Sequence, residues 1–320
     1  MPQAMLFGRL ADSLAREGVE QLDAGNPGTA LALLGLAARL SPSNAQLRYA
    51  AARAASALGA RDKAALYCEQ AAMLDPSFGE PHELLSQLFL HGPWYLEILE
   101  RLHGLLRPRT YVEIGVDKAE SMRLAGTGPR CIGVDPEPTI SSPLPPNVRI
   151  FAQTSDEFFR QTDVRGELGG LPVDLAFIDG MHHFEAALRD FVNLERLCHG
   201  GSTILIHDCF PHDRRTAQRE RATDFWSGDV WRLVVLLKKH RPDLSIHTLA
   251  APPTGLCVVR NLDPGSEYLS RNLAAVTDEL MRLDYAFLRK DRAGKLNLAP
   301  NDWGYVQRLF ASQSAATAQA

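Results

Sequence analysis

The sequence predicts an α/β fold built on a mostly parallel sheet with an antiparallel edge hairpin, preceded by a separate all-α domain. Three observations support this prediction. The first ninety residues repeat a helical pattern at a fixed spacing. After residue 108, short β-branched runs alternate with helical patterns, which is typical of parallel strands joined by crossover helices. The last two runs are linked only by "APPTG", which is too short for a crossover and predicts a hairpin.

Composition limits the classes of protein to which the chain can belong. Of 320 residues, 45% are hydrophobic and 22% are charged, which is ordinary globular usage for about two domains. The net charge of -4 gives no general attraction to nucleic acid or to anionic membranes. The opening residues lack the pattern of a signal peptide, and no apolar run approaches about 18 residues. Five cysteines without a C-x-x-C pair predict reduced thiols and no four-thiolate zinc site, so we expect a cytoplasmic protein.

The first ninety residues contain an internal repeat. The matching positions are Gly25 with Gly59, Ala30 with Ala64, Ala37 with Ala71, Leu40 with Leu74, and Pro42 with Pro76, each pair 34 residues apart. Small residues let two helices cross closely, and an apolar residue followed by a proline ends the second helix. This pattern resembles the tetratricopeptide repeat. The resemblance implies a repeat domain over residues 1–91 that binds a protein partner, with the helix over residues 80–90 as its cap. A generic alanine-rich helical bundle is the alternative.

Seven strand patterns follow the repeats. They are "TYVEIG", "RCIGVD", "NVRIFA", "VDLAFID", "STILIHD", "LSIHTLA" and "GLCVVRN". Five parallel strands closed by an antiparallel pair resemble the Rossmann-like sheet of class I S-adenosylmethionine-dependent methyltransferases. The resemblance implies such a domain over residues 92–265. We expect residues 266–320 to form a helical extension, and the tail over residues 312–320 has the composition of disorder.

The ends of the first two strands carry candidate cofactor residues, because ligands of open α/β sheets bind outside the carboxyl ends of the strands. Gly115 ends the first strand, and Asp135 ends the second strand 20 residues later. An acid at that place can accept both ribose hydroxyls of a cofactor, and the alternative is a turn or helix-cap aspartate. Glu113 is either a cofactor residue or a buried acid that needs a polar partner.

The resemblance to class I methyltransferases assigns further cofactor residues. Gly115 corresponds to the glycine that lets the backbone approach the methionine part of S-adenosylmethionine. Ser121 corresponds to a serine near the cofactor carboxylate, and Thr154 and Ser155 occupy the place that borders the adenine. The sequence departs from the family at Ala119, where another glycine is usual.

A nicotinamide-dependent dehydrogenase would share the strand order and the ribose acid. Its G-x-G-x-x-G turn is missing, because the corresponding stretch is "GVDKAE". A cofactor pyrophosphate needs close backbone approach at a helix N-terminus. Asp117 and Glu120 would repel it, so this class is not favoured.

An acid and two histidines follow the fourth strand. "FIDGMHHFEAALRDF" and "GGSTILIHDC" resemble the I-D-G-x-H-x-[YF]-E and H-D motifs of macrocin-type and related sugar or antibiotic O-methyltransferases, over roughly residues 95–262. The resemblance implies that Asp179 and Asp208 bind Mg²⁺ or Mn²⁺, that Asp179 also borders the cofactor, and that His182 is the catalytic base. His207 stands where metal-dependent relatives have a glutamate. Its imidazole would complete a weaker metal site with the two carboxylates.

These residue types suit methyl transfer to oxygen. A hydroxyl is a poor nucleophile at neutral pH, a divalent cation lowers its pKa, and a histidine can take its proton as the methyl group moves. We therefore expect a S-adenosylmethionine-dependent methyltransferase acting on a hydroxyl of a sugar, a glycan or a natural product. The alternative is an inactive methyltransferase-like scaffold whose repeats bind a protein.

Two neighbouring segments have structural interpretations as well. We expect His183 to open the helix that follows it, and Asp229 and Trp231 to open a later helix. The run from Pro211 to Trp231 is either a solvated helix or a mobile insert whose arginines attract an anionic acceptor. These arginines are Arg214, Arg215, Arg219 and Arg221.

Overall fold

The computed structural model describes residues 2–223 and 225–317, which form two compact units. The helical unit comprises the residues up to 90 together with residues 221–226. The sheet unit comprises residues 91–220 and those from 227 onward. No helix in the described ranges combines the length and the apolar character that a membrane crossing requires. The five cysteines are all buried and unpaired.

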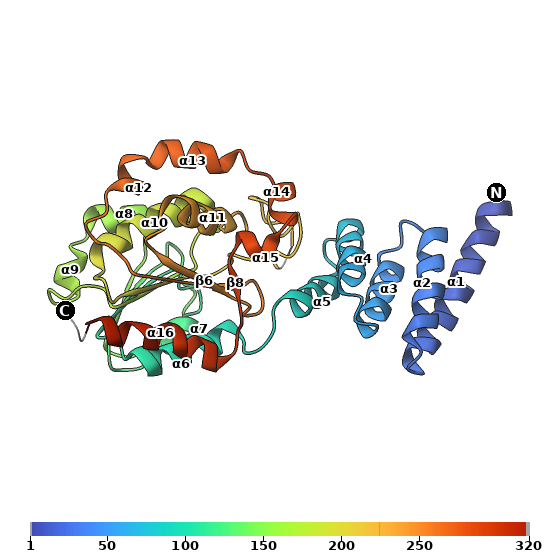
Figure 1. Ribbon diagram of the computed structural model, residues 1–320, viewed down its shortest axis with the longest axis horizontal. Coiled ribbons are helices and arrows are strands. Elements are labelled where there is room, and N and C mark those ends of the chain that lie inside the picture. Colours follow the sequence, from blue (N-terminus) through green and yellow to red (C-terminus); the bar gives the residue numbers. More distant parts are fainter. Residues whose placement is uncertain (1, 224, 318–320) are drawn as a thin grey trace. The chain divides into compact units, whose positions relative to one another are not determined.

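The helical unit is a row of helices, each packed against the next (Figure 1). Its helices are α1 (Pro2–Asp23), α2 (Pro27–Leu40), α3 (Ala45–Ala57), α4 (Arg61–Leu74) and α5 (Gly79–Phe89). The turns before α2 and α4 contain Gly25 and Gly59, whose φ angles of +77° and +71° suit glycine. Ala30 and Ala64 are completely buried one turn into the two helices. The 34-residue period is therefore the period of a helical pair, and the assignment to the tetratricopeptide class stays a prediction.

The sheet unit is built on eight strands in the order β3-β2-β1-β4-β5-β7-β6-β8. Their bounds are β1 (Thr110–Ile114), β2 (Arg130–Val134), β3 (Val148–Phe151), β4 (Leu175–Ile178), β5 (Thr203–Ile206), β6 (Ser245–Leu249), β7 (Leu256–Arg260) and β8 (Leu298–Ala299). The first five strands run parallel, and β7 pairs antiparallel with both β5 and β6. The predicted parallel sheet with an antiparallel edge hairpin is confirmed.

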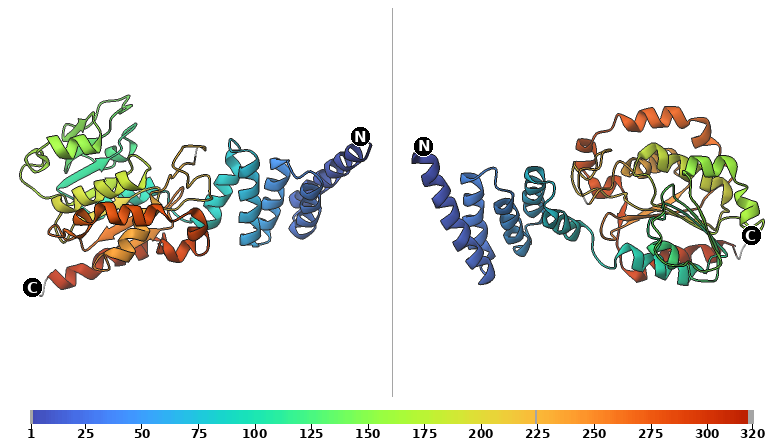
Figure 2. Two further views of the ribbon diagram at one scale, coloured as in Figure 1. Left: turned by 90° about the horizontal axis from the view of Figure 1, so that it is seen from above. Right: turned by 180° about the vertical axis from the view of Figure 1, so that it is seen from behind.

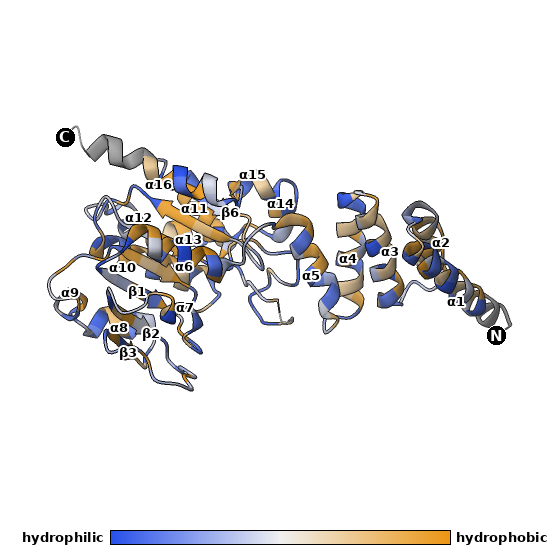
Figure 3. Ribbon diagram, turned by 90° about the horizontal axis from the view of Figure 1, so that it is seen from below, coloured by the Kyte–Doolittle hydropathy of each residue, from blue (hydrophilic) through white to orange (hydrophobic). Residues whose placement is uncertain are grey.

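Helices cover both faces of this sheet, as Figures 1 and 2 show. On one face lie α6 (Tyr95–Leu106), α7 (Glu120–Arg123) and α16 (Trp303–Thr317), and on the other lie α8 (Ser155–Gln161), α10 (Phe184–Leu197) and α11 (Trp231–His240). Strands β1, β4, β5 and β7 are buried at every position, because both of their faces are covered. The apolar strands and helix faces stand out in Figure 3.

The C-terminal segment adds a strand that the sequence analysis did not predict. Its short helices are α12 (Tyr268–Arg271), α13 (Leu273–Met281), α14 (Tyr285–Arg289) and α15 (Arg292–Lys295), and α9 (Val164–Glu167) is a similar short helix earlier in the chain. Strand β8 then pairs parallel with β6 and extends the sheet. Helix α16 continues to Thr317, whereas disorder is predicted from residue 312, and residues 318–320 lie outside the described residues.

The C-terminal segment also holds the start of α6. The side-chain amide of Asn301 donates to the carbonyl oxygens of His91 and Pro93, at 2.9 and 2.8 Å. Gly92 has a φ of +94°, and a Cβ there would lie 2.6 Å from the carbonyl oxygen of Asn301. The backbone N–H of Tyr95 donates to the carbonyl oxygen of Pro252 at 3.1 Å. These contacts place Tyr95 at the edge of the sheet where the candidate site lies.

Candidate active site

The predicted strand-end residues meet at one edge of the sheet, because β2, β1 and β4 are neighbours and run in the same direction. The backbone N–H of Asp179 donates to the carbonyl oxygen of Ile114 at 2.8 Å, which brings the ends of β4 and β1 together. Gly115 has a φ of +90°, and a Cβ there would lie 2.1 Å from the carbonyl oxygen of Asp179. Only glycine fits this approach of the two chains.

Glu113 is completely buried, and both of its oxygens have partners inside the protein. Oε2 accepts from the hydroxyl of Tyr111 at 2.7 Å, and Oε1 accepts from the hydroxyl of Ser121 at 2.6 Å. Burial raises the pKa of Glu113 to about 8, against the opposite effect of the two hydroxyl donors. The sequence predicts Glu113 and Ser121 next to the cofactor. In the structure they bind each other and anchor α7 to β1.

Asp135 lies at the end of β2 with its carboxylate bound by backbone N–H groups. Oδ2 accepts from Val116 and Asp117, each at 2.9 Å, and Oδ1 accepts from Glu137 at 2.8 Å. A carboxylate offers roughly four lone-pair sites, so about one remains for a ribose hydroxyl. The turn-stabilising role that the sequence left open is therefore present in the structure. A bidentate ribose contact would require the loop after β1 to release one of these hydrogen bonds.

The loop after β1 adopts glycine-type conformations without glycine. Asp117 has a φ of +42°, and Ala119 has a φ of +63° and is completely buried. For residues with a Cβ, the left-handed region costs roughly 1–2 kcal/mol. Ala119 therefore occupies a backbone conformation that glycine would adopt at lower cost.

Thr154 and Ser155 follow β3, at the predicted adenine border. The hydroxyl of Thr154 accepts from the backbone N–H of Glu157 at 3.3 Å, and Glu157 Oε2 accepts from the backbone N–H of Thr154 at 3.1 Å. This is a capping box at the start of α8. The hydroxyl of Ser155 hydrogen-bonds to the buried Asp190, whose pKa burial raises to about 7. Both side chains thus have structural partners at the site edge.

Two carboxylates and two imidazoles come together at the ends of β4 and β5. His207 Nδ1 lies 3.0 Å from Asp179 Oδ1 and 3.2 Å from Asp208 Oδ2. His182 Nε2 lies 3.1 Å from Asp208 Oδ2 and 3.8 Å from Asp179 Oδ1. Asp208 holds its place with a φ of +54°, which is a strained conformation at a site residue. The structure thus assembles all four residues that the motif predicts.

The charges in this cluster stabilise one another. Burial alone would lower the pKa of His207, but Asp179 and Asp208 raise it to about 10. Burial would raise the pKa of Asp208, but the imidazoles of His182 and His207 hold it below its ordinary range. Burial also raises the pKa of Asp179, which His207 opposes. His207 is therefore the cationic partner of the carboxylate pair at neutral pH.

A divalent cation fits the donor set that Asp179, His182 and Asp208 form. Asp179, His182 and Asp208 each offer a ligand atom, and these atoms lie within 4.8 Å of one another. Two carboxylates and one imidazole suit Mg²⁺ or Mn²⁺. The predicted metal set contains His207 in place of His182. The ligand atoms that lie close together are those of Asp179, His182 and Asp208, so the geometry favours His182 as the third donor.

The segment after β5 is fixed by buried charges. The fully buried Asp229 accepts from the backbone N–H of Phe184 through Oδ1 at 2.7 Å, and through Oδ2 it pairs with Arg219 at 2.8 Å and with Arg232 at 2.6 Å. Arg219 also pairs with both oxygens of Glu185. Arg219, one of the four arginines expected to attract an acceptor, is thus already paired with internal carboxylates. The segment forms turns in place of a helix.

The same segment holds the backbone of His182. The N–H of Asp229 donates to the carbonyl oxygen of His182 at 3.2 Å, and a Cβ on Gly228 would lie 1.9 Å from that oxygen. The sequence predicts that Asp229 opens the helix that forms α11 in the structure. That helix does begin at Trp231, but the side chain of Asp229 caps α10 instead. His183 is the N-cap residue of α10, and its Nε2 lies 3.1 Å from the carbonyl oxygen of Arg219.

Tyr95 is a site residue that the sequence analysis missed. Its ring stacks on the ring of His207, with centroids 4.0 Å apart and an interplanar angle of 25°. Burial raises the pKa of Tyr95, and the next contributions come from Asp179 and Asp208. Tyr95 lies 84 residues before Asp179 in the chain, and no motif pointed to it.

Residues 112–209 match the family model of a methyltransferase domain. No curated protein matches the chain. The matched residues run from within β1 to just after β5, and so cover most of the parallel part of the sheet.

Several solved structures are similar to the chain at low identity. One is the O-methyltransferase TomG from Streptomyces achromogenes, which is involved in tomaymycin synthesis and was solved with S-adenosylmethionine (16% identity, 53% of this chain and 80% of that chain, TM-score 0.43). Another is an O-methyltransferase from Bacillus cereus in complex with S-adenosylhomocysteine (14% identity, 56% and 89%, TM-score 0.38). A third is the S-adenosylhomocysteine-bound methyltransferase PaMTH1 from Podospora anserina (13% identity, 64% and 96%, TM-score 0.40).

Proposed function

We propose that this protein transfers the methyl group of S-adenosylmethionine to a hydroxyl group, with His182 as the base. The single observation behind the proposal is the contact of 3.1 Å between His182 Nε2 and Asp208 Oδ2, at the carboxyl edge of a methyltransferase sheet. A carboxylate at one imidazole nitrogen orients the ring and stabilises the imidazolium that forms when the ring takes a proton. This is the arrangement that a positioned base requires.

The cofactor would lie across the ends of β1, β2 and β4. The methionine part would lie along the turn at Gly115, where the ends of β1 and β4 meet, and Asp135 offers its remaining lone-pair site to the ribose. The sulfonium of S-adenosylmethionine carries its own leaving group. The protein must therefore align the acceptor oxygen with the methyl carbon and remove the hydroxyl proton.

The proton and the electrons balance in one displacement. The acceptor oxygen forms a bond to the methyl carbon, the carbon–sulfur bond breaks, and its electron pair stays on the neutral thioether. The hydroxyl proton moves to the imidazole of His182, whose positive charge the Asp208 carboxylate stabilises. Asp179 lies 3.8 Å from the same imidazole nitrogen and adds to this negative potential.

A divalent cation would be held by Asp179, Asp208 and His182. When bound, such a cation lowers the pKa of a coordinated hydroxyl and so makes it a better nucleophile. His182 Nε2 cannot both donate a hydrogen bond to Asp208 and ligate a cation, so the roles of oriented base and of ligand exclude each other. Metal stimulation in wild type together with the response of His182 variants therefore distinguishes a base from a ligand.

We expect the acceptor hydroxyl to belong to a sugar, a glycan or a natural product, in line with the I-D-G-x-H-x-F-E and H-D motifs. The helical unit would bind a protein partner. It has a cavity of about 340 Å³ between α3 and α5, lined by the polar side chains of Tyr49, Arg53, Glu80 and Glu83 among others. Such a surface suits a polar peptide segment more than an apolar one.

Calorimetric titration of the full chain with S-adenosylhomocysteine tests the proposal first. Wild type should bind, and Asp135→Ala should bind at least tenfold more weakly, since a hydrogen bond to a charged group contributes about 1.5–3 kcal/mol. Glu137→Ala is the matched control, because it changes a neighbouring exposed acid that only supplies a backbone N–H to Asp135. Equal affinity of Asp135→Ala and wild type would place the cofactor elsewhere.

One observation favours a second function, that of an inactive scaffold. Asp135 already accepts three backbone hydrogen bonds, and the loop that supplies two of them has Asp117 and Ala119 in left-handed conformations. A loop closed on the ribose acid would exclude the cofactor. The same titration decides between the two functions, because a scaffold would show no heat of binding at any pH.

A further inference from the structure

Tyr95 covers one face of the His207 ring, although it lies outside the segment that matches the methyltransferase model. It is the first residue of α6, whereas the family match begins at residue 112. The two rings lie 4.0 Å apart at an angle of 25°, so one face of the imidazole is covered by the phenol ring. Phe177 of β4 lies 6.1 Å from the imidazole at an angle of 51° and offers no comparable stack.

The polar contacts of His207 do not fix the tilt of its ring, whereas the stack with Tyr95 does. Nδ1 approaches Asp179 and Asp208, and Nε2 approaches the hydroxyl of Thr254 at 3.3 Å. All of these partners lie near the edge of the ring, where they set the ring's position but resist a tilt only weakly. An aromatic ring against the flat face resists that tilt, because tilting would separate the two stacked faces.

The backbone of Tyr95 is itself well held. Its N–H donates to Pro252, and Asn301 binds the carbonyl oxygens of His91 and Pro93 just before it. The hydroxyl of Tyr95 has no hydrogen-bond partner among the described residues, so the ring is held by its backbone and by stacking.

We propose that Tyr95 is a positioning residue of the active site, whose ring holds His207 in the orientation that keeps Asp179 and Asp208 beside His182. The effect on turnover rests on the proposed function, whereas the effect on His207 does not. Helix α6 then takes part in the reaction although it precedes the methyltransferase core. The aromatic ring makes the stacking contact, so a phenylalanine at position 95 should preserve the positioning role and an aliphatic side chain should lose it.

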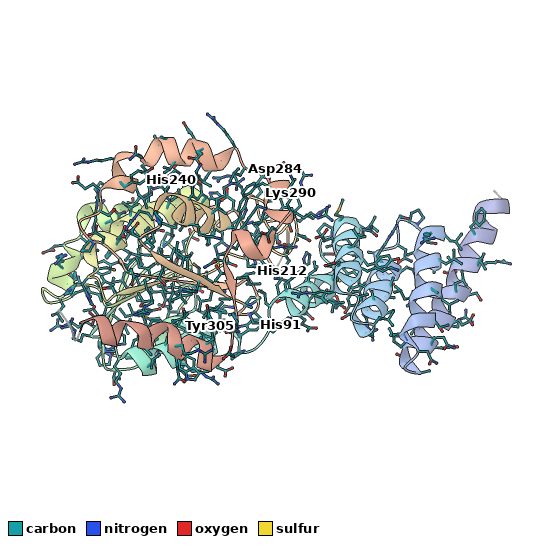
Figure 4. All side chains as sticks on the ribbon, in the orientation of Figure 1. His91, His212, His240, Asp284, Lys290 and Tyr305 are labelled. Atoms are coloured by element: carbon teal, nitrogen blue, oxygen red, sulfur yellow. The ribbon has the colours of Figure 1, made fainter. Side chains whose placement is uncertain are left out.

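The experiment compares Tyr95→Leu and Tyr95→Phe in the full chain, with Tyr305→Leu as the matched control. Tyr305 lies on α16 (Figure 4) and also contacts a histidine, but edge-on, with ring centroids 6.1 Å apart at 67° and its hydroxyl 3.0 Å from His247 Nδ1. His247 lies on β6, away from the cluster at β4 and β5. Three readouts are measured. They are the NMR shifts of the His207 ring protons, assigned with His207→Gln, the affinity for S-adenosylhomocysteine, and kcat and KM for an acceptor.

In wild type and Tyr95→Phe, the stacked ring should shield the His207 protons and turnover should be similar. In Tyr95→Leu, these signals should move downfield, and kcat should fall on the order of 10²-fold with unchanged cofactor affinity, as expected for a misplaced catalytic group. Tyr305→Leu should change neither readout. Unchanged His207 shifts in Tyr95→Leu would overturn the proposal, as would moved shifts with full turnover.

Two further outcomes are equally decisive. If Tyr95→Phe is as impaired as Tyr95→Leu, the hydroxyl acts directly and the positioning role is wrong. If wild type neither binds S-adenosylhomocysteine nor turns over, the proposed function fails. The ring-proton shifts of Tyr95→Leu would still show whether the stack orients His207, so the two failures are distinguishable.

Discussion

The carboxylate of Asp229 accepts a hydrogen bond of 2.7 Å from the backbone N–H of Phe184, although 45 positions separate the two residues in the chain. The helix that follows the site histidines is thus capped by a distant aspartate. That aspartate is completely buried and also binds Arg219 and Arg232. The segment after β5 and the start of α10 are therefore joined to each other beside His182.

Asp229→Ala should destabilise the protein strongly, because it removes the carboxylate that two partly buried arginines share. Loss of one partner of a buried ion pair costs roughly 3–5 kcal/mol, and the lost cap adds about 1 kcal/mol. Asp229→Asn should cost less, since its amide oxygen can still accept from Phe184. The measurement is urea unfolding followed by circular dichroism. Glu97→Ala removes an exposed pair with Arg101 and should change the unfolding free energy by at most about 1 kcal/mol.

Ala119→Gly should stabilise the protein. Ala119 has a φ of +63°, which glycine adopts without the cost of a Cβ. The expected gain in unfolding free energy is only about 0.5 kcal/mol, after the greater freedom of glycine in the unfolded chain and the loss of a buried methyl group are subtracted. Ala187→Gly, inside the regular helix α10, is the opposite control and should lose at least about 1 kcal/mol. Loss of stability in both variants would contradict the strain assigned to the loop.

Glu113 should make the protein less stable as pH rises from about 5 to 8. Its pKa is raised from 4.5 to about 8 by burial, so the folded state keeps a proton that the unfolded state has lost in this window. The unfolding free energy then falls by at most about 1.4 kcal/mol per pH unit from this group. Glu113→Gln cannot titrate and should remove this slope. If the unfolding free energies of wild type and Glu113→Gln change with pH by the same amount, Glu113 is ionised when buried.

The two aspartates of the cluster and His182 should fail in different ways. Asp179→Asn and Asp208→Asn should lose metal-stimulated turnover, and excess Mn²⁺ should restore part of it if both carboxylates are ligands. His182→Ala should keep cofactor binding and lose on the order of 10²–10⁴ in rate, with a residual rate that rises with pH. The measurement is turnover with and without EDTA. Full EDTA-resistant activity in wild type would show that no metal is needed and would leave His182 as a metal-free base. Full activity of His182→Ala would show that His182 is not the base.

Local signals in the sequence were sufficient for the architecture. The 34-residue repeat follows from small residues that must face a neighbouring helix, and the parallel strands follow from continuous apolar runs that are buried on both faces. Gly115, Asp135, Asp179 and Asp208 could be placed at the strand ends for the same reason. The carboxyl ends of parallel neighbours must lie at one edge of the sheet.

Only the tertiary structure decided what those side chains contact. Asp229 caps α10, Tyr95 stacks on His207, and β8 joins β6, because the closing of the fold brings together segments that lie far apart in the chain. Such contacts leave no periodic pattern, since each needs one side chain at one place. The amino-acid order therefore determined where the site lies. The packing of the segments around it determined which residues hold His182, His207 and the two carboxylates in place.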